Sequence, residues 1–114
     1  MDSLGIMNPL EASQHVHALA CYILCLADVY EETETDHERR LLYQLLEKVQ
    51  QQMTEFIKVL PHMENIIRMY TSVRDLSWRT ENPKLRHNPY QDEFRSPIMQ
   101  SVRDILKAAQ SADS

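Results

Sequence analysis

Residues 42–70 of the chain read LYQLLEKVQQQMTEFIKVLPHMENIIRMY. Apolar residues recur along these letters with spacings that alternate between four and three. A helix turns about 3.6 residues at a time, so the pattern predicts one apolar seam along one side of a helix. The seam consists of Leu42, Leu46, Val49, Met53, Phe56, Leu60, Met63, Ile67 and Tyr70.

Pro61 lies inside this seam. A proline in a helix interior removes one backbone hydrogen bond and clashes with the carbonyl group four residues earlier, which costs about 3 kcal/mol. The seam nevertheless keeps its phase across Pro61, and no glycine or polar turn precedes it. We therefore expect one long helix from about residue 36 to about residue 76, kinked at Pro61. The alternative is that the chain folds back near Pro61 and a separate helix begins there.

An earlier helix has a clear start. Residues 8–11, NPLE, offer an asparagine cap, a proline for the first helical position and a glutamate for a capping box. We expect this helix to run to about Tyr30. A second capping box, from Thr35 to Glu38, predicts a short turn over 31–35 and the start of the next helix. The inner stripe of the first helix is Ala12, Val16, Leu19, Ile23, Leu26 and Tyr30.

The C-terminal third is less regular. Residues 77–96 contain two Asn-Pro pairs and predict a long loop. Ser96-Pro97 has the form of a capped helix start, so we expect a last helix from there to about residue 110, with the stripe Ile98, Val102, Ile105 and Ala109. The fold class is then all-α, an antiparallel helical bundle of three long helices, the second kinked at Pro61, or of four helices. We expect one domain over 9–110, with flexible ends at 1–8 and 111–114.

Composition limits the kinds of site. The chain has one glycine in 114 residues, which excludes a glycine-rich phosphate loop and hence a Rossmann or P-loop nucleotide site. Hydrophobic residues make up 43% of the chain and charged residues 25%, as in a folded domain. The net charge is −5, which opposes binding to nucleic acid.

A local excess of basic residues supports an alternative function. Residues 66–90 carry a net charge of +3, which would suit a nucleic-acid-associated adaptor. This excess is small for a chain that is acidic overall, so we do not expect nucleic acid as the partner. The basic residues of the stretch are Arg68, Arg74, Arg79, Lys84 and Arg86.

We expect neither a signal peptide nor a membrane span. Asp2 stands where a signal peptide would be basic, and the uncharged run over 12–27 is too short to cross a bilayer. Cys21 and Cys25 are one helical turn apart, where a disulfide would strain the backbone. Two reduced thiols are typical of the cytoplasm or the nucleus, which are the expected locations.

Four potential metal ligands share one side of the first helix, and histidine and cysteine can bind zinc. They spread over about 16 Å of helix, too far for one tetrahedral centre without a ligand from elsewhere, such as His37 or His62. A metal- or thiol-dependent activity is therefore only a third hypothesis. We expect no bound metal, no cofactor and no enzymatic activity. The four residues are His17, Cys21, Cys25 and Asp28.

The outer face of the first helix is unusually apolar for a solvent-facing side. The other helices of so short a chain cannot easily cover both sides of this helix, and monomeric proteins rarely expose a large apolar patch. We therefore expect this face to bind a helical partner or a second copy of the chain. Its residues are His17, Cys21, Leu24 and Cys25.

A second candidate set lies in the long loop. Trp78, Tyr90 and Phe94 are aromatic residues of the kind that anchor protein interfaces. The alternative is that they fold back as a lid over the bundle. Ser96-Pro97 also fits a minimal proline-directed phosphorylation pattern, which occurs often by chance.

The sequence thus predicts a non-catalytic module for protein–protein interaction, scaffolding or dimerisation that acts through helix packing. The nucleic-acid adaptor and the metal- or thiol-dependent activity are the alternatives. The identity of the partner lies beyond what the residues indicate.

Overall fold

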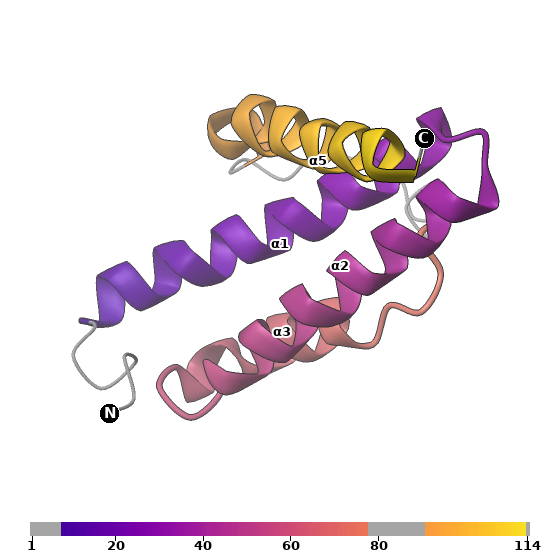
Figure 1. Cartoon of the computed structure of the whole chain (residues 1–114). Coiled ribbons are helices and arrows are strands. Elements are labelled where there is room, and N and C mark those ends of the chain that lie inside the picture. Colours follow the sequence, from indigo (N-terminus) through magenta and orange to yellow (C-terminus); the bar gives the residue numbers. More distant parts are fainter. Residues whose placement is uncertain (1–7, 78–90, 114) are drawn as a thin grey trace.

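The structure, a computed structural model, describes residues 8–77 and 91–113, with side chains described for 8–77 and 96–109. Within these residues the chain forms four α-helices, one short 3-10 helix and no β-strand, which confirms the all-α, four-helix prediction. Figure 1 shows α1 flanked by α5 on one side and by α2 and α3 on the other. The elements are α1 (Pro9–Glu32), α2 (Asp36–Glu55), η2 (Pro61–Met63), α3 (Glu64–Thr71) and α5 (Gln91–Asp113).

The two predicted helix starts are confirmed. The Asn8 side chain accepts a hydrogen bond from the Glu11 backbone N–H at 2.8 Å, and proline occupies the first position of α1. Thr35 caps α2 by accepting a hydrogen bond from the Glu38 N–H at 3.2 Å, and its hydroxyl donates to the Glu38 carboxylate at 2.9 Å. Residues 33–35 between the helices are too few for anything but a tight antiparallel hairpin.

Arginine and tyrosine side chains brace this hairpin. The Thr33 hydroxyl donates to the Tyr30 carbonyl at 2.7 Å and accepts from the Arg39 Nε at 3.2 Å. The Arg39 guanidinium also lies 5.3 Å from the centre of the Tyr30 ring, within the range of a cation–π interaction. The Tyr43 ring meets Tyr30 edge-on at 5.9 Å. The antiparallel packing of α1 on α2 is therefore fixed at its hairpin end.

The expected long helix through Pro61 is not formed, so that prediction is wrong. The helix ends at Glu55, after which the Leu60 N–H donates to the Phe56 carbonyl at 2.8 Å within a series of turns. Leu60 itself has φ −127° and ψ 68°. A proline sterically disfavours the helical conformation in the residue before it, which accounts for the break at Leu60. The chain then folds back, and η2 and α3 run along α2.

Two side chains of α2 hold the returning segment. The Gln50 Nε2 donates to the carbonyls of Tyr70 at 3.1 Å and Val73 at 2.7 Å, at the C-terminal end of α3 and just beyond it. Further along, the Tyr43 hydroxyl accepts a hydrogen bond from the Leu76 N–H at 3.2 Å. Residues 64–77 are thus tied to α2 by both apolar and polar contacts.

The last helix differs from its prediction at both ends. Helix α5 begins at Gln91 and contains Pro97 inside it, so residues 91–96 are helical and Ser96 is not a cap. It also extends to Asp113, beyond the expected end at residue 110. The missing N–H of Pro97 costs one bond to Glu93, early in the helix. Met99, Val102 and Leu106 are its buried side chains, whereas Ile105 of the predicted stripe is 38% exposed.

One core joins all these elements. Every residue of the apolar seam is buried, although the seam is divided between α2, the turn, η2 and α3 rather than carried by one helix. Folding back at Leu60 keeps the seam inward on both sides of the turn. The longest extent of the molecule is 43 Å, shorter than the roughly 60 Å that a single helix over 37–76 would need.

Candidate protein-binding surface

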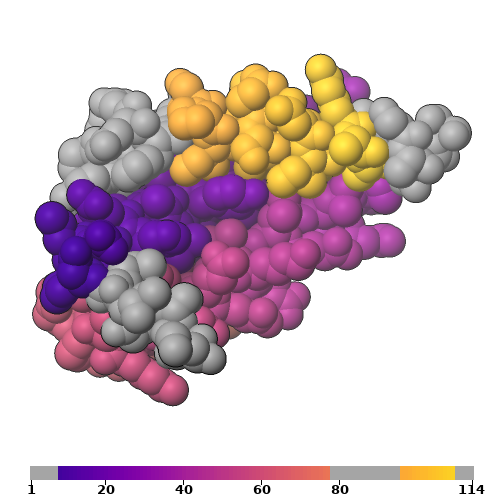
Figure 2. Space-filling view, turned by 60° about the vertical axis from the view of Figure 1, so that its left-hand side comes forward, coloured from indigo at the N-terminus to yellow at the C-terminus, as the bar shows by residue number. Residues whose placement is uncertain are grey.

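The outer face of α1 is not on the surface. Cys21, Leu24 and Cys25 are each fully buried, and His17 is only partly exposed. Figure 2 shows α5 lying across α1, and the two helices pack extensively against each other. The expectation that this face is left uncovered by the chain itself is therefore wrong. Its apolar residues are used inside the bundle, where α5 covers them.

Helix α5 reaches α1 through apolar and charged groups. Met99, Val102 and Leu106 are buried and spaced by three and four residues, so they lie on one side of the helix. The Arg103 guanidinium forms an ion pair with Glu32, at 2.8 Å, where α1 ends. The pKa of Arg103 is raised, first by its hydrogen bond to Glu32 and then by the charge of the Glu32 carboxylate.

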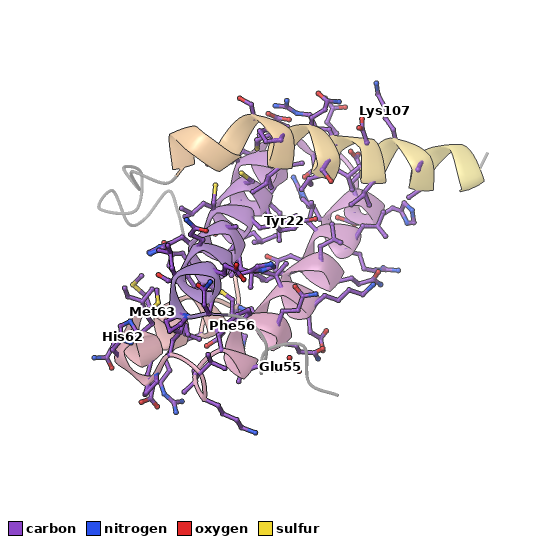
Figure 3. All side chains as sticks on the ribbon, turned by 90° about the vertical axis from the view of Figure 1, so that its left-hand side faces the viewer. Tyr22, Glu55, Phe56, His62, Met63 and Lys107 are labelled. Carbon is purple, nitrogen blue, oxygen red and sulfur yellow. The ribbon has the colours of Figure 1, made fainter. Side chains whose placement is uncertain are left out.

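A small exposed apolar surface lies on α3. Ile66 is 43% exposed and Met69 is 41% exposed, and the pair is three residues apart on the same side of the helix. His62 precedes Ile66 by four residues and is also exposed. In Figure 3, His62 and Met63 lie near Phe56 at the end of the bundle where α2 turns into α3. We call His62, Ile66 and Met69 the α3 stripe.

A polar pair borders this stripe. The Arg68 guanidinium, one residue from Met69, is held by the Glu64 carboxylate at 2.7 Å. Both side chains are well exposed, so the pair contributes little to stability but keeps the charge next to the apolar groups partly neutralised. The α3 stripe therefore has an apolar centre and a charged margin.

A shallow groove of about 520 Å³ runs along the other side of α3, where α3 meets α2. Polar contacts within the chain already occupy its floor: Gln50 binds backbone carbonyls, and Arg74 donates to the Thr71 and Val73 carbonyls at 2.7 and 3.0 Å. We interpret the groove as the seam of the α2–α3 packing. Its lining is Tyr43, Leu46, Glu47, Gln50, Gln51, Thr54, Thr71, Val73 and Arg74.

Besides Arg103, the fold shifts the pKa of several titratable groups, His17, Tyr43 and Asp75 among them. Partial burial lowers the pKa of His17, which favours the neutral imidazole. Burial also raises the pKa of Tyr43, whose hydroxyl donates to the Asp75 carboxylate at 3.4 Å. The pKa of Asp75 is lowered, first because its carboxylate accepts the Ser77 backbone N–H at 2.9 Å. None of these shifts gathers groups into a catalytic arrangement.

The remaining predicted site residues fall partly outside the described residues. Trp78 and Tyr90 lie in 78–90, which the structure does not describe, and Phe94 belongs to the helical backbone of α5 without a described side chain. Of the basic stretch, Arg68 and Arg74 are described and are both engaged within the chain, by Glu64 and by backbone carbonyls respectively.

The metal hypothesis gains no support from geometry. Over 8–77 and the described part of α5, no three histidine, cysteine, aspartate or glutamate side chains come together in a way that could hold an ion. Neither cysteine forms a disulfide, and both are buried. A reactive thiol is usually found in a partly exposed, electropositive setting, so neither cysteine has the surroundings of a nucleophile.

Sequence analysis did not identify the α3 stripe. Ile66 and Met69 each stand directly before a residue of the apolar seam, so they were counted with the apolar residues of the core. Ile67 and Tyr70 satisfied the predicted pattern, and the apolar residues beside them were not weighed separately. The signal was nevertheless present: two apolar residues, spaced by three, directly next to an apolar seam. They occupy a second side of the same helix, one that the core does not use.

Comparison with known proteins adds no further indication. No protein-family model matches the chain, and no curated protein or solved structure shows a significant match. In the part of the chain that the structure describes, no helix has both the length and the apolar character needed to cross a membrane.

Proposed function

We propose that this chain is a non-catalytic helical module that binds another protein through the α3 stripe. We base this on one observation: Ile66 and Met69 are adjacent, apolar and more than 40% exposed. The described residues already bury 24 apolar side chains without them. The apolar character of these two positions therefore has no evident use in the core, and burial against a partner would provide one.

The chemistry of the stripe indicates the kind of partner. Protein interfaces combine an apolar centre with a polar, solvent-accessible margin, and Ile66 and Met69 beside the Arg68–Glu64 pair have this arrangement. Methionine is unbranched and adapts to irregular partner surfaces. The spacing of four and three along His62, Ile66 and Met69 suits an amphipathic helix laid along α3. We therefore propose a partner helix with an apolar side.

A scaffolding or adaptor role in the cytoplasm or the nucleus belongs to the same proposal. Its support is chemical: the chain keeps two free, buried thiols, and structural thiols of this kind are typical of reducing compartments. The proposal includes no cofactor, metal or catalytic residue.

The test compares two tagged variants with the wild type as baits for quantitative mass spectrometry. Ile66→Glu/Met69→Glu places charge on the α3 stripe while keeping good helix formers. Leu10→Glu is the matched control, because Leu10 is 68% exposed but lies at the start of α1. We expect a partner that the wild type and Leu10→Glu retain equally and that the double variant loses at least about tenfold, which corresponds to roughly 1.4 kcal/mol.

Circular dichroism must first show that the three proteins share one helix content and similar melting temperatures. The proposal fails if the double variant is folded and retains every partner that the wild type retains. A fragment of the partner should then bind the purified wild type in calorimetry, and its binding should weaken with the same substitutions.

A further inference from the structure

The serine that precedes the proline inside α5 is open to solvent. Ser96 and Pro97 are both exposed. Pro97 also lines a shallow surface depression of about 510 Å³ together with Gln100 and Ser101, so its ring is accessible from outside. Of the five prolines in the chain, only Pro97 follows a serine or threonine. An accessible serine followed by an accessible proline is the minimal pattern that a proline-directed kinase recognises.

Pro97 also makes the beginning of α5 the part of this helix that is most easily lost. A proline has no backbone N–H, and it disfavours the helical conformation in the residue before it, which is Ser96. A regular helix pairs each N–H with the carbonyl four residues earlier. By this pattern, only the N–H groups of Ile98 and Met99 join residues 91–95 to the helix that follows Pro97. Two backbone hydrogen bonds therefore decide whether α5 includes this segment.

We propose that Ser96 is a phosphorylation site, and that its phosphate moves the start of α5 from Gln91 to Pro97. A proline-directed serine kinase would transfer the γ-phosphoryl group of ATP to the Ser96 hydroxyl. The bond from Oγ to phosphorus forms, and the bond from this phosphorus to the oxygen that bridges it to the β-phosphate breaks. The hydroxyl proton passes to the base of the kinase, and ADP leaves. The product carries an added charge of about −1.5 to −2 at neutral pH.

The phosphate stabilises the shorter helix because it acts as a cap. When the helix begins at Pro97, Ser96 stands in the cap position and proline in the first helical position, as at the start of α1. The N–H groups of Ile98 and Met99 then have no carbonyl to bind within the helix. Phosphate oxygens on Ser96 accept both, at the positive end of the helix dipole.

The longer helix gains nothing from the phosphate. Within it, the N–H groups next to Ser96 are already paired with backbone carbonyls. Asp92 and Glu93 precede Ser96 by four and three residues, spacings at which like charges destabilise a helix. The added charge therefore opposes the helical state of residues 91–95 while it favours the shorter helix.

The packing of α5 on α1 allows the change. All the described contacts that hold α5 to the core come after Pro97, so a helix that begins there keeps them. They are the buried side chains of Met99, Val102 and Leu106 and the ion pair between Arg103 and Glu32 at 2.8 Å.

Incubation of the purified protein with a proline-directed kinase and ATP tests the site. Mass spectrometry should find about one phosphate per chain, on Ser96, and none in Ser96→Ala. Pro97→Ala keeps the hydroxyl but removes the recognised ring, and should slow incorporation at least about tenfold. Ser101→Ala is the matched control, since Ser101 is exposed on the same helix but no proline follows it, and it should not change the rate. If the folded wild type accepts no phosphate, or accepts it elsewhere, the proposal is overturned.

Backbone chemical shifts of the phosphorylated and unphosphorylated protein test the change in the helix. The helical population of residues 91–95 should fall at least about twofold, while residues 98–109 stay helical. The amide protons of Ile98 and Met99 should move downfield as they bind the phosphate. If residues 91–95 remain as helical as before, or if the whole of α5 loses its helical shifts, the phosphate does not move the start of the helix and the proposal is refuted. Neither readout involves the α3 stripe.

Discussion

Replacing Phe56 by alanine tests whether its ring is buried against α1 at the end of α2. Phe56 is the first residue after α2 and is only 5% exposed. Its ring stacks on His15 of α1, with 5.8 Å between ring centres and 20° between ring planes. Figure 3 shows Phe56 inside this end of the bundle and Glu55 next to it in the sequence. Phe56 is also a residue of the apolar seam, so a helix that continued through Pro61 would keep the ring inward as well, and the substitution tests the burial of the ring rather than the turn.

The expected loss follows from burial. Truncating a buried phenylalanine to alanine removes its transfer free energy and leaves a cavity, which together cost about 3–5 kcal/mol. The stacking on His15 accounts for about 1 kcal/mol of this, within the range of about 0.5–1.5 kcal/mol known for ring pairs. A domain of this size has a total stability of about 5–15 kcal/mol. Phe56→Ala should therefore lower the melting temperature by at least about 12 °C.

Urea unfolding followed by circular dichroism measures the change in the free energy of unfolding. The control is Glu55→Ala, because Glu55 is exposed and its loss should change that free energy by less than about 0.5 kcal/mol. The denaturant slopes of the two variants should agree with that of the wild type, so that the midpoints compare directly. A loss below about 1 kcal/mol for Phe56→Ala would show that the ring is not buried against α1, which would refute the packing at this end of the bundle.

Three further outcomes follow from polar groups. Gln50→Ala should lower the free energy of unfolding by about 1–3 kcal/mol in urea, because it removes two part-buried hydrogen bonds to the carbonyls of Tyr70 and Val73. Gln51→Ala, at an exposed position, should change that free energy little. Asp75 has a lowered pKa in the folded protein, chiefly because its carboxylate accepts the Ser77 N–H. The stability from this bond is therefore present above the unfolded pKa near 4 and is lost as the pH falls through the folded pKa. Asp75→Asn should remove this pH dependence from melting curves recorded below about pH 4. His17 also has a lowered pKa, because burial disfavours its charged form. Stability is therefore lost as the pH falls below the unfolded pKa near 6.5, and His17→Gln should flatten the plot of stability against pH between about pH 7 and 5. An unchanged slope would show that burial does not lower the pKa of His17.

The all-α class and the core were readable from the sequence because they depend on periodicity alone. The seam residues are all buried, and the caps at Asn8 and Thr35 are where their local chemistry predicts them. A helix cap depends on residues within three or four positions of it, and the burial of the apolar seam depends on the spacing of its apolar residues. Both are local properties that a single chain displays without its neighbours.

The turn at Leu60 was not readable in this way. Turns are usually recognised in a sequence by glycine, which allows a positive φ, or by polar residues. No described residue has a positive φ, and Leu60 is apolar and buried in the core, so this turn carries neither signal. The chain reverses because Pro61 disfavours helix at Leu60 and because Phe56 and Leu60 gain burial on α1. An unbroken heptad phase cannot separate one kinked helix from two helices that fold back on each other, since both keep the same residues inward.

The start of α5 shows the same limit. The sequence contains two possible start signals for the last helix, Asn88-Pro89 and Ser96-Pro97. Sequence analysis used Ser96-Pro97, whereas α5 begins at Gln91, shortly after Asn88-Pro89. This error moved the predicted stripe by one residue, from Ile98 and Ile105 to the observed Met99 and Leu106. The helix that covers α1 was therefore not recognised as its cover, and the apolar surplus of α1 was assigned to an outside partner.

The apolar residues in question lie on two surfaces, which differ in whether an outside partner can reach them. The α3 stripe is exposed, so a partner can bind it without any rearrangement of the described residues. The outer face of α1, with Cys21 and Cys25, is buried under α5, so an outside partner would reach it only by displacing that helix. The two surfaces can consequently be tested separately. Charge on Ile66 and Met69 should abolish partner capture while both cysteines stay protected, whereas loss of the Val102 contact should expose the cysteines while the α3 stripe stays intact. A variant that changed both readouts at once would mean that α3 and α5 act on one common surface, and the α3 stripe could then not stand as a separate binding site.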